Sequence, residues 1–248
     1  MSQSLIDPAA PPESTGLRRR LHSRVRKDAA FWLISRRLMV LLIFTGLSVP
    51  SFSDGASDNT DLSRALAAWQ ENLRQVTSVS SRFVQEKKMA LFRDTLRMEG
   101  RMTADHAGHF AWEVFSPMRY KLLVNGDQIS QWDEETDRVQ VLSRGKNPVV
   151  GAIYEQMSAW LSGSFTTLTN TYNARLLGSN PIAIEFSPLE SSAMRSYIHT
   201  IVLRLRDDAQ YLSRIEIVDA SGDETSISFL DTQLNPVIDP AFWTRVRP

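Results

Sequence analysis

A long stretch of alternating apolar and polar residues, from Val76 to Gln140, constrains most strongly what this chain can fold into. In its centre, Phe110, Trp112 and Val114 occupy every second position. Successive side chains of a β-strand point to opposite faces, so these three residues share one face. The sequence Asn125-Gly126-Asp127 lies between two such runs and is a strong hairpin signal. The stretch therefore predicts an antiparallel meander that is polar outside and aromatic inside.

The remaining body of the chain also favours strands joined by polar turns. Turn residues such as Asn180-Pro181 and Ser221-Gly222-Asp223 separate apolar runs, and Asp133–Asp137 has the composition of a solvated turn. A closing segment from Asn235 to Trp243 is predicted to be extended, with a short helical turn. The predicted strands are residues 80–89, 95–103, 172–177, 182–186, 198–205, 211–218 and 225–230.

Two segments have helical rather than strand periodicity. The first is capped by Thr60 or Asp61 and the second follows Pro148, at residues 149–161. Neither helix connects parallel strands, so the sequence predicts an α+β fold in which two amphipathic helices cover the concave face of a strongly curved antiparallel sheet. The apolar positions of the helices are Leu62, Ala65, Leu66, Trp69, Leu73 and Val76 in the first, and Val149, Ile153, Met157, Trp160 and Leu161 in the second.

The first 53 residues are interpreted as an address rather than as part of the fold. Residues 1–17 are rich in Pro, Ala and Ser and are expected to be disordered. An Arg-rich segment, an apolar run at 38–47 and small residues ending at Ser53 then follow in the order of a secretory signal peptide. The alternative is an uncleaved anchor, but the apolar run is shorter than the roughly 20 residues that span a bilayer. Residues 54–248 are then one domain.

Charge and cysteine content exclude several classes of function. Eight of the 28 basic residues and three of the 28 acidic residues lie in residues 1–53, so residues 54–248 carry 20 basic and 25 acidic residues. An acidic body argues against non-specific binding to nucleic acid. The chain has no cysteine, which excludes disulfides, thiolate metal sites, a cysteine nucleophile and a lipid-modified N-terminal cysteine.

The motifs of the body occur in the same order as in a known family. This order, behind a signal peptide and without cysteine, resembles the LolA-type periplasmic carriers of outer-membrane lipoproteins, and the resemblance covers nearly all of residues 58–245. Besides the leading helix and the helix after Pro148, the matching motifs are Phe83-Val84-Gln85, Gly108-x-Phe110-x-Trp112 with Pro117 downstream, Leu123-Val124-x-Gly126, Trp132-Asp133 and Asp239-Pro240-x-Phe242.

The resemblance implies an incomplete β-barrel whose helices form a lid over a hydrophobic cavity for acyl chains. It also implies an inner-membrane transporter that loads the carrier and an outer-membrane receptor lipoprotein that empties it. One motif differs, because Asp105-His106-Ala107 stands where the family usually has Lys-Arg-Pro, whose arginine helps to hold the lid closed. A histidine makes fewer hydrogen bonds than a guanidinium group, so His106 is the candidate for an altered lid control. This difference makes a divergent carrier of another lipid or glycolipid plausible.

The aromatic and aliphatic residues of the strands and helices permit two interpretations. They line a lipid cavity or they form an ordinary packed core, and periodicity alone does not separate the two. The candidate cavity residues are Phe83, Phe110, Trp112, Val114 and Trp132 from the strands, and Leu66, Trp69, Leu73, Ile153 and Met157 from the helices.

The sequence gives little support for catalysis or metal binding. No Gly-x-Ser-x-Gly, His-Glu-x-x-His or phosphate-binding glycine loop occurs. His106 and His109 offer no convincing third metal ligand beyond Asp105, and no cofactor is predicted.

We therefore expect a non-enzymatic, monomeric periplasmic carrier of acylated lipoproteins or related lipids, without nucleic-acid partners. The alternatives are a lipid-sensing or lipoprotein-sensing interaction domain of the same fold, and an enzyme with catalytic groups scattered along the chain.

Overall fold

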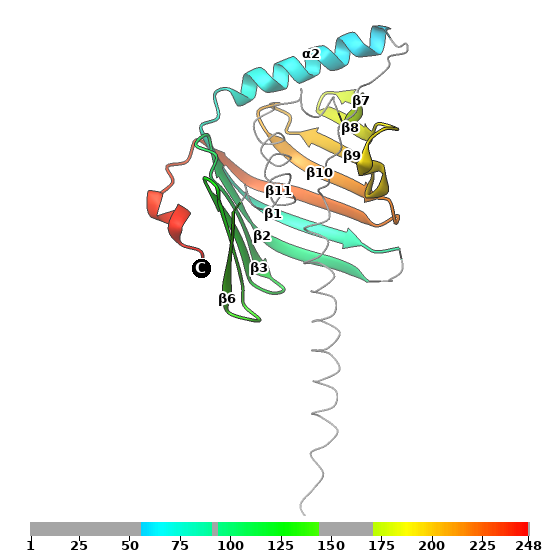
Figure 1. The fold of residues 1–248 in the computed structure, drawn as a ribbon. Coiled ribbons are helices and arrows are strands. Elements are labelled where there is room, and N and C mark those ends of the chain that lie inside the picture. The colour runs from blue at the N-terminus through cyan, green and yellow to red at the C-terminus, as the bar shows by residue number, and fades with distance from the viewer. Residues whose placement is uncertain (1–55, 91–93, 144–170, 248) are drawn as a thin grey trace, which may run out of the picture. The chain divides into compact units, whose positions relative to one another are not determined.

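The computed structural model of this chain describes residues 56–90, 94–143 and 171–247. They belong to one compact unit, residues 42–248. In the described part of this unit, Figure 1 shows a large sheet, a long helix and a short C-terminal helical turn. The predicted address segment, including the proposed cleavage after Ser53, lies outside the described residues.

Eleven strands form one antiparallel sheet, in the spatial order β6-β5-β4-β3-β2-β1-β11-β10-β9-β8-β7. Among the described strands, the first and the last along the chain pair at the centre of the sheet, and β6 and β7 are its two edges. The predicted meander and the predicted strands of the last third are thus confirmed, with ends shifted by a few residues. The strands are β1 Ser78–Lys88, β2 Thr95–Asp105, β3 Phe110–Ser116, β4 Tyr120–Asn125, β5 Gln128–Asp133, β6 Arg138–Ser143, β7 Tyr172–Ser179, β8 Ile182–Pro188, β9 Ile198–Leu205, β10 Leu212–Asp219 and β11 Glu224–Leu234.

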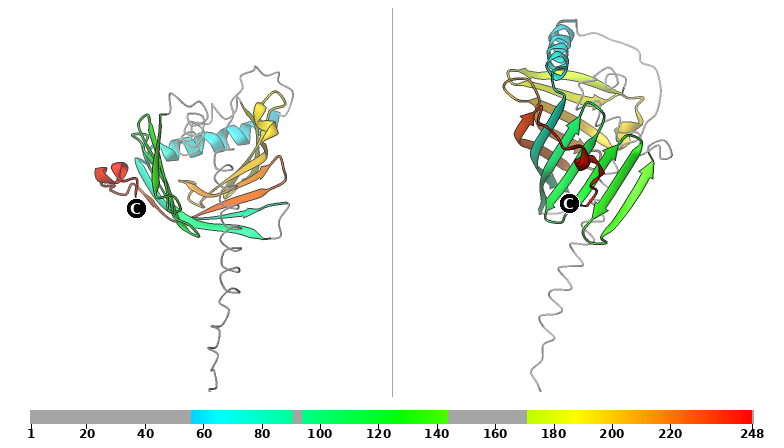
Figure 2. Two further views of the ribbon diagram at one scale, coloured as in Figure 1. Left: turned by 60° about the horizontal axis from the view of Figure 1, so that its bottom comes forward. Right: turned by 90° about the vertical axis from the view of Figure 1, so that its left-hand side faces the viewer.

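The sheet is open and strongly curved, as expected from the sequence (Figure 2). Irregularities in strand pairing occur between β1 and β11, β9 and β10, β2 and β3, and β7 and β8. An extra residue in one strand bends it and increases its twist. These irregularities therefore help the eleven strands to curl around a concave side instead of forming a flat sheet.

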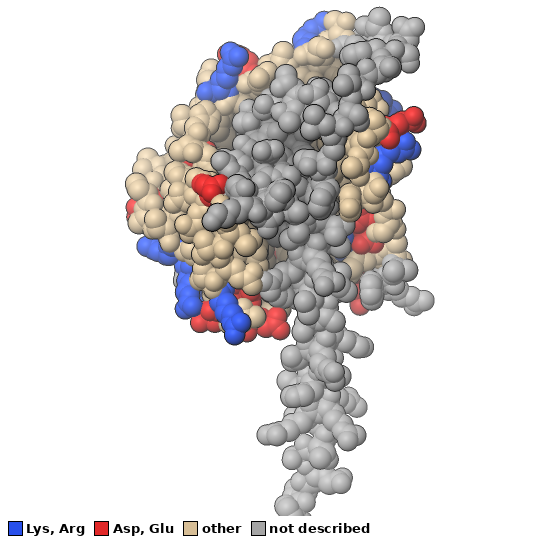
Figure 3. Space-filling model, viewed as in Figure 1, with Lys and Arg blue, Asp and Glu red and all other residues tan. Residues whose placement is uncertain are grey.

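The two faces of the sheet differ in polarity because the sequence alternates along each strand. The inner, concave face is largely apolar: Ile184 and Leu203 are fully buried and lie opposite each other on β8 and β9. The outer face of most strands carries charges in cross-strand pairs, such as Arg204 with Glu216 at 2.8 Å and Arg97 with Glu86 at 3.0 Å. In the view of Figure 3, positive and negative side chains lie interspersed around the periphery of the molecule.

Helix α2 (Ala56–Leu73) is the α-helix of the described residues. Its buried side chains Leu62, Trp69 and Leu73 lie on one face, as the sequence predicts. The predicted cap at Thr60 or Asp61 is wrong, because the helix begins four residues earlier at Ala56. Asp61 instead lies inside the helix and pairs with Arg64 at 2.9 Å, the three-residue spacing that stabilises a helix surface.

The helix packs at one edge of the sheet. Its contacts are with β7, and Asn72 donates a hydrogen bond from Nδ2 to the carbonyl of Ala209 at 3.0 Å. The predicted cover of the concave face by two helices is therefore not confirmed, since the second helix, at 149–161, lies outside the described residues. In the part of the chain that the structure describes, no helix has the length and apolarity to cross a membrane.

The C-terminal strap, residues 235–247, covers the outer face of β3 and β4. It contains the short helical turn η3 (Pro240–Thr244), which confirms the predicted closing segment. Trp243 packs against Ala111 and Leu123, and Asn125 donates to its carbonyl at 3.1 Å. The expectation that the outside of the meander is polar is therefore wrong here: Ala111 and Leu123 are an apolar patch that the strap removes from water.

Candidate functional site

The inner face of β1, β2 and β3 holds a stacked pair of aromatic rings. The ring centroids of Phe83 on β1 and Trp112 on β3 lie 3.8 Å apart, with an angle of 20° between the ring planes. Met102 of β2 pairs with Trp112 and is 1 % exposed, and Phe83 is equally buried. The two rings make a rigid apolar platform near the middle of the sheet.

A glycine in the intervening strand makes this stacking possible. Gly100 of β2 lies opposite Phe83, and the Phe83 ring covers it. A Cβ atom at this position would collide with that ring and with the carbonyl oxygen of Glu113. The missing side chain therefore lets the rings of two non-adjacent strands meet over the strand between them.

An apolar row extends from this platform towards the β6 edge. Phe110 stacks beside Trp112 with centroids 6.4 Å apart and pairs in register with Val124 of β4. Val124 pairs with Ile129 of β5, which in turn pairs with Leu142 of β6. The register thus carries a continuous apolar surface across four strands. Val114, the remaining strand candidate on β3, lies on the same face beside Gly100.

The candidate cavity residues of the two predicted helices lie either near β7 or outside the described residues. Trp69 and Leu73 of α2 are buried and Leu66 is half-buried, on the helix that contacts β7. That strand is at the opposite end of the strand order from β6. Ile153 and Met157 lie outside the described residues.

Comparison with known proteins identifies the family. The model of the family "Outer membrane lipoprotein carrier protein LolA" matches residues 74–245. This chain belongs to the LolA family. The match spans the eleven-stranded sheet, the aromatic platform and nearly all of the C-terminal strap.

Individual relatives are distant. An outer-membrane lipoprotein carrier protein of Chromohalobacter salexigens is 26% identical over 173 residues, which are 69% of this chain and 78% of the relative. One of Neisseria meningitidis serogroup C is 28% identical over 193 residues, 77% of this chain and 82% of the relative. Among solved structures, a LolA superfamily protein from Nitrosomonas europaea superposes with a TM-score of 0.40 at 11% identity, over 74% of this chain and 97% of that one.

The Trp132 side chain does not lie on the inner face of this LolA-family sheet. Trp132 pairs with Lys121 of β4, and Lys121 pairs with Glu113 of β3. Glu113 lies on the outer face of the sheet, opposite to the face that carries Trp112, and the side chain of Trp132 therefore also lies on the outer face. Trp132 makes its contacts there. Its indole nitrogen donates to Asp137 at 2.9 Å, and the guanidinium group of Arg119 lies 5.8 Å from its ring. The assignment of Trp132 to the cavity is therefore wrong.

The sequence contains a signal that predicts this orientation. The Gly126-Asp127 turn leaves only two residues between the paired Asn125 and Gln128, so an even-numbered residue of β4 faces an odd-numbered residue of β5. The inner face therefore switches from even positions on β3 and β4 to odd positions on β5. Trp132, an even position, must point outward.

His106 lies in the exposed turn between β2 and β3, where its backbone N–H donates to the carbonyl of Thr77 at 2.9 Å. Its predicted role in lid control stays a prediction. The neighbouring His109 makes the side-chain contacts: its Nδ1 lies 2.8 Å from Asp105 Oδ2, and its ring stacks on Trp243 at 5.0 Å. The sequence pattern suggested only metal binding as a role for His109 and did not predict these contacts.

The carboxylates of the turn after β5 are not all solvated. Asp133 is 2 % exposed, and its Oδ1 accepts hydrogen bonds from the backbone N–H and the hydroxyl of Thr136, both at 2.9 Å. The expectation of a fully solvated turn is therefore wrong at this position. The buried carboxylate holds the turn closed by satisfying its backbone.

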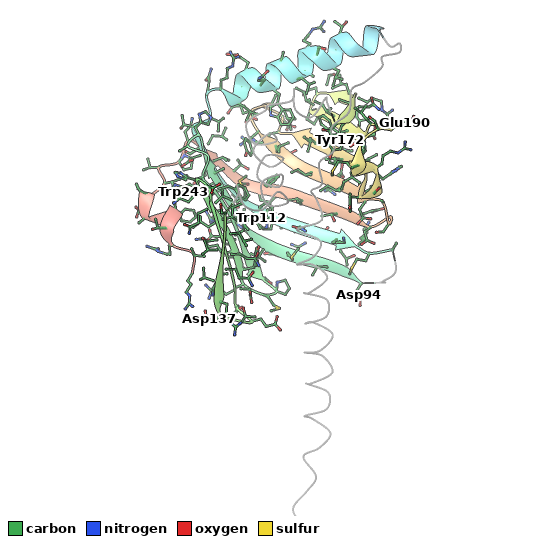
Figure 4. All side chains as sticks on the ribbon, viewed as in Figure 1. Asp94, Trp112, Asp137, Tyr172, Glu190 and Trp243 are labelled. Carbon is green, nitrogen blue, oxygen red and sulfur yellow. The ribbon has the colours of Figure 1, made fainter. Side chains whose placement is uncertain are left out.

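The outer face holds a buried ion pair that the sequence pattern did not predict. Lys121 Nζ lies 3.0 Å from Glu113 Oε1, and both side chains are largely shielded from water. The ring of Phe242, in the strap, lies 4.5 Å from the same ammonium group. Trp112 and Trp243 are labelled in Figure 4, one on β3 and the other on the strap. The strap thus packs directly behind the strand that carries Trp112.

Two buried tyrosines mark the other half of the sheet. Burial raises the pKa of Tyr172, on β7, to about 12, and burial also raises the pKa of Tyr211. The hydroxyl of Tyr211 is buried without a hydrogen-bond partner in the described structure. Both phenols are therefore neutral at ordinary pH and contribute apolar surface.

Proposed function

We propose that this chain is a non-enzymatic periplasmic carrier that binds acyl chains of lipoproteins, or of a related lipid, on the inner face of its sheet. The observation that carries the proposal is the continuous apolar surface from Phe83 and Trp112 through Phe110 to Leu142. The opposite, outer face of most strands carries paired charges, so the carrier stays in water while an acyl chain is bound on the inner face. The relatives named as lipoprotein carriers support the same cargo class.

The energetics need no specific headgroup motif. Each methylene group removed from water contributes roughly 0.8 kcal/mol, so one long acyl chain supplies substantial affinity. Phe83 and Trp112 are less than a tenth exposed, so an incoming chain must displace the groups that pack on them. This displacement would make loading and release depend on partner proteins.

The proposed route runs from the inner to the outer membrane. An inner-membrane transporter would load the carrier, and an outer-membrane receptor lipoprotein would empty it. The carrier is proposed to act as a monomer, because a single sheet supplies the whole apolar face.

Native mass spectrometry of the mature protein, purified from periplasm without detergent, tests the binding step. We expect an added mass that corresponds to an acylated molecule, and palmitate should load onto the emptied protein. A protein that is always free of ligand and takes up no palmitate would contradict the proposal. Transfer of the bound species to outer-membrane vesicles, but not to phospholipid vesicles, tests the route.

A further inference from the structure

The two edges of the sheet are protected differently. Edge strands expose unpaired backbone groups, and proteins usually block them with bulges, with lysine or proline, or by covering them. Strand β7 has a pairing irregularity between Leu176 and Gly178 and is in contact with α2. Strand β6 pairs with β5 through six consecutive residues without irregularity. Its sequence, Arg138–Ser143, contains no lysine, glycine or proline.

The side chains of β6 are also unusually apolar for the outer surface. Val139 and Val141 point outward with 40 % and 58 % of their surface exposed, whereas the outer face of strands such as β9 and β10 carries charge pairs. In the described residues, the guanidinium group of Arg138 has no carboxylate partner. Within the described residues, this regular, apolar edge with an unpaired Arg138 is suited to an added extended strand.

The edge is continuous with the proposed acyl-binding surface. The apolar row of the inner face ends at Leu142 on β6. The neighbouring row of paired residues is apolar on β3 and β4, at Trp112 and Leu122, but polar on β5 and β6, at Gln131 and Gln140. The inner face therefore becomes polar at this edge. Three strand spacings separate β3 from β6, about 14 Å. An acyl chain that lies on the aromatic platform can thus reach the edge, where the polar part of its cargo would emerge.

From this continuity, and resting on the proposed function, we propose that the edge of β6, which has no further strand beside it among the described residues, binds the polypeptide segment of a lipoprotein cargo as an added strand. The segment is the one that follows the acylated residue. Main-chain hydrogen bonds read a peptide without regard to its sequence, which suits a carrier of many cargoes. Arg138 adds a preference for an acidic residue in this segment. A phospholipid or glycolipid has no peptide backbone and gains nothing at this edge.

The test compares three probes on the full mature chain. The first is an N-palmitoyl peptide of ten residues with alternating apolar and polar side chains and one glutamate, and the second is palmitamide. The third is a pair of N-palmitoyl peptide analogues, N-methylated at the odd or at the even residues. We expect the palmitoyl peptide to bind at least tenfold tighter than palmitamide. An added strand pairs through alternate residues, so only one methylated analogue should lose this gain.

Hydrogen exchange locates the contact. The palmitoyl peptide should slow amide exchange in residues 138–143, and palmitamide should not. The double variant Val139→Lys/Val141→Lys should lose the tenfold gain but keep palmitamide binding. Leu177→Lys, on the covered β7 edge and 42 % exposed in the native protein, is the matched control and should keep both.

Different failures have different meanings. Equal affinity for the palmitoyl peptide and palmitamide, or equal losses from both methylated analogues, would overturn the edge proposal while the acyl-binding function stands. Absence of binding by every probe would instead contradict the proposed function. If the double lysine variant does not fold, the methylated analogues and hydrogen exchange on the unmodified protein still decide the question.

Discussion

The ring of Phe83 stacks on the indole of Trp112 at 3.8 Å although a whole strand separates their backbones. The contact exists because Gly100, on the strand between them, has no side chain. One backbone position therefore decides the shape of the apolar platform.

Replacement of Gly100 by alanine should destabilise the protein by about 1–3 kcal/mol, because the added methyl group overpacks the site. The near-ultraviolet circular dichroism of Trp112 should change at the same time, since Phe83 must move. Gly178→Ala is the control, because the nearest atom to its Cβ would be the carbonyl oxygen of Pro181 at 3.5 Å, an ordinary contact. Urea unfolding measures both; equal stability of the two variants would argue against the Gly100 explanation.

Replacement of Trp112 by glutamate should reduce palmitate binding at least tenfold, because a carboxylate on the inner face must lose its hydration when an acyl chain binds. Phe115→Glu, on the same strand but 51 % exposed, should leave binding unchanged. Binding is measured by titration after circular dichroism has established that each variant is folded. A folded Trp112→Glu protein with normal affinity would exclude Trp112 from the acyl site, and Trp112→Gln supplies the measurement if the glutamate variant unfolds.

Replacement of Lys121 by methionine should cost about 3 kcal/mol of stability, because it leaves Glu113 shielded from water without its partner. The double variant Lys121→Met/Glu113→Gln should recover most of this loss. In the exposed pair of Arg97 and Glu86, water screens both charges, so Arg97→Met should cost much less stability than Lys121→Met. Thermal and urea unfolding of the four proteins test the contrast, which would fail if the double variant were as unstable as the single one.

Stability should fall at alkaline pH because of Tyr172. Burial raises the pKa of Tyr172 from its ordinary value of 10.0 to about 12 in the folded protein, so the unfolded chain releases the phenolic proton first as the pH rises. The stabilisation of the folded state that Tyr172 contributes is fully present below pH 10. It is lost between pH 10 and about 12, at no more than roughly 1.4 kcal/mol per pH unit. Tyr172→Phe should make the loss shallower in urea unfolding between pH 9 and 11.5. An unchanged slope would show that Tyr172 does not ionise differently on folding.

The sequence by itself determined the local elements of this protein. Alternation placed Phe110, Trp112 and Val114 on one face, and the Asn125-Gly126 signal located a hairpin that the structure contains. The motif order identified the LolA family, which the family model confirms. These features depend on residues close together in the chain, so periodicity and turn chemistry suffice to predict them.

Only the tertiary structure decided which surfaces meet. Ala111 and Leu123 are buried because a strap more than a hundred residues later packs on them, and the stacking of Phe83 on Trp112 depends on Gly100 in a third segment. Alternation assigns faces within a strand, but register and long-range packing determine what each face touches.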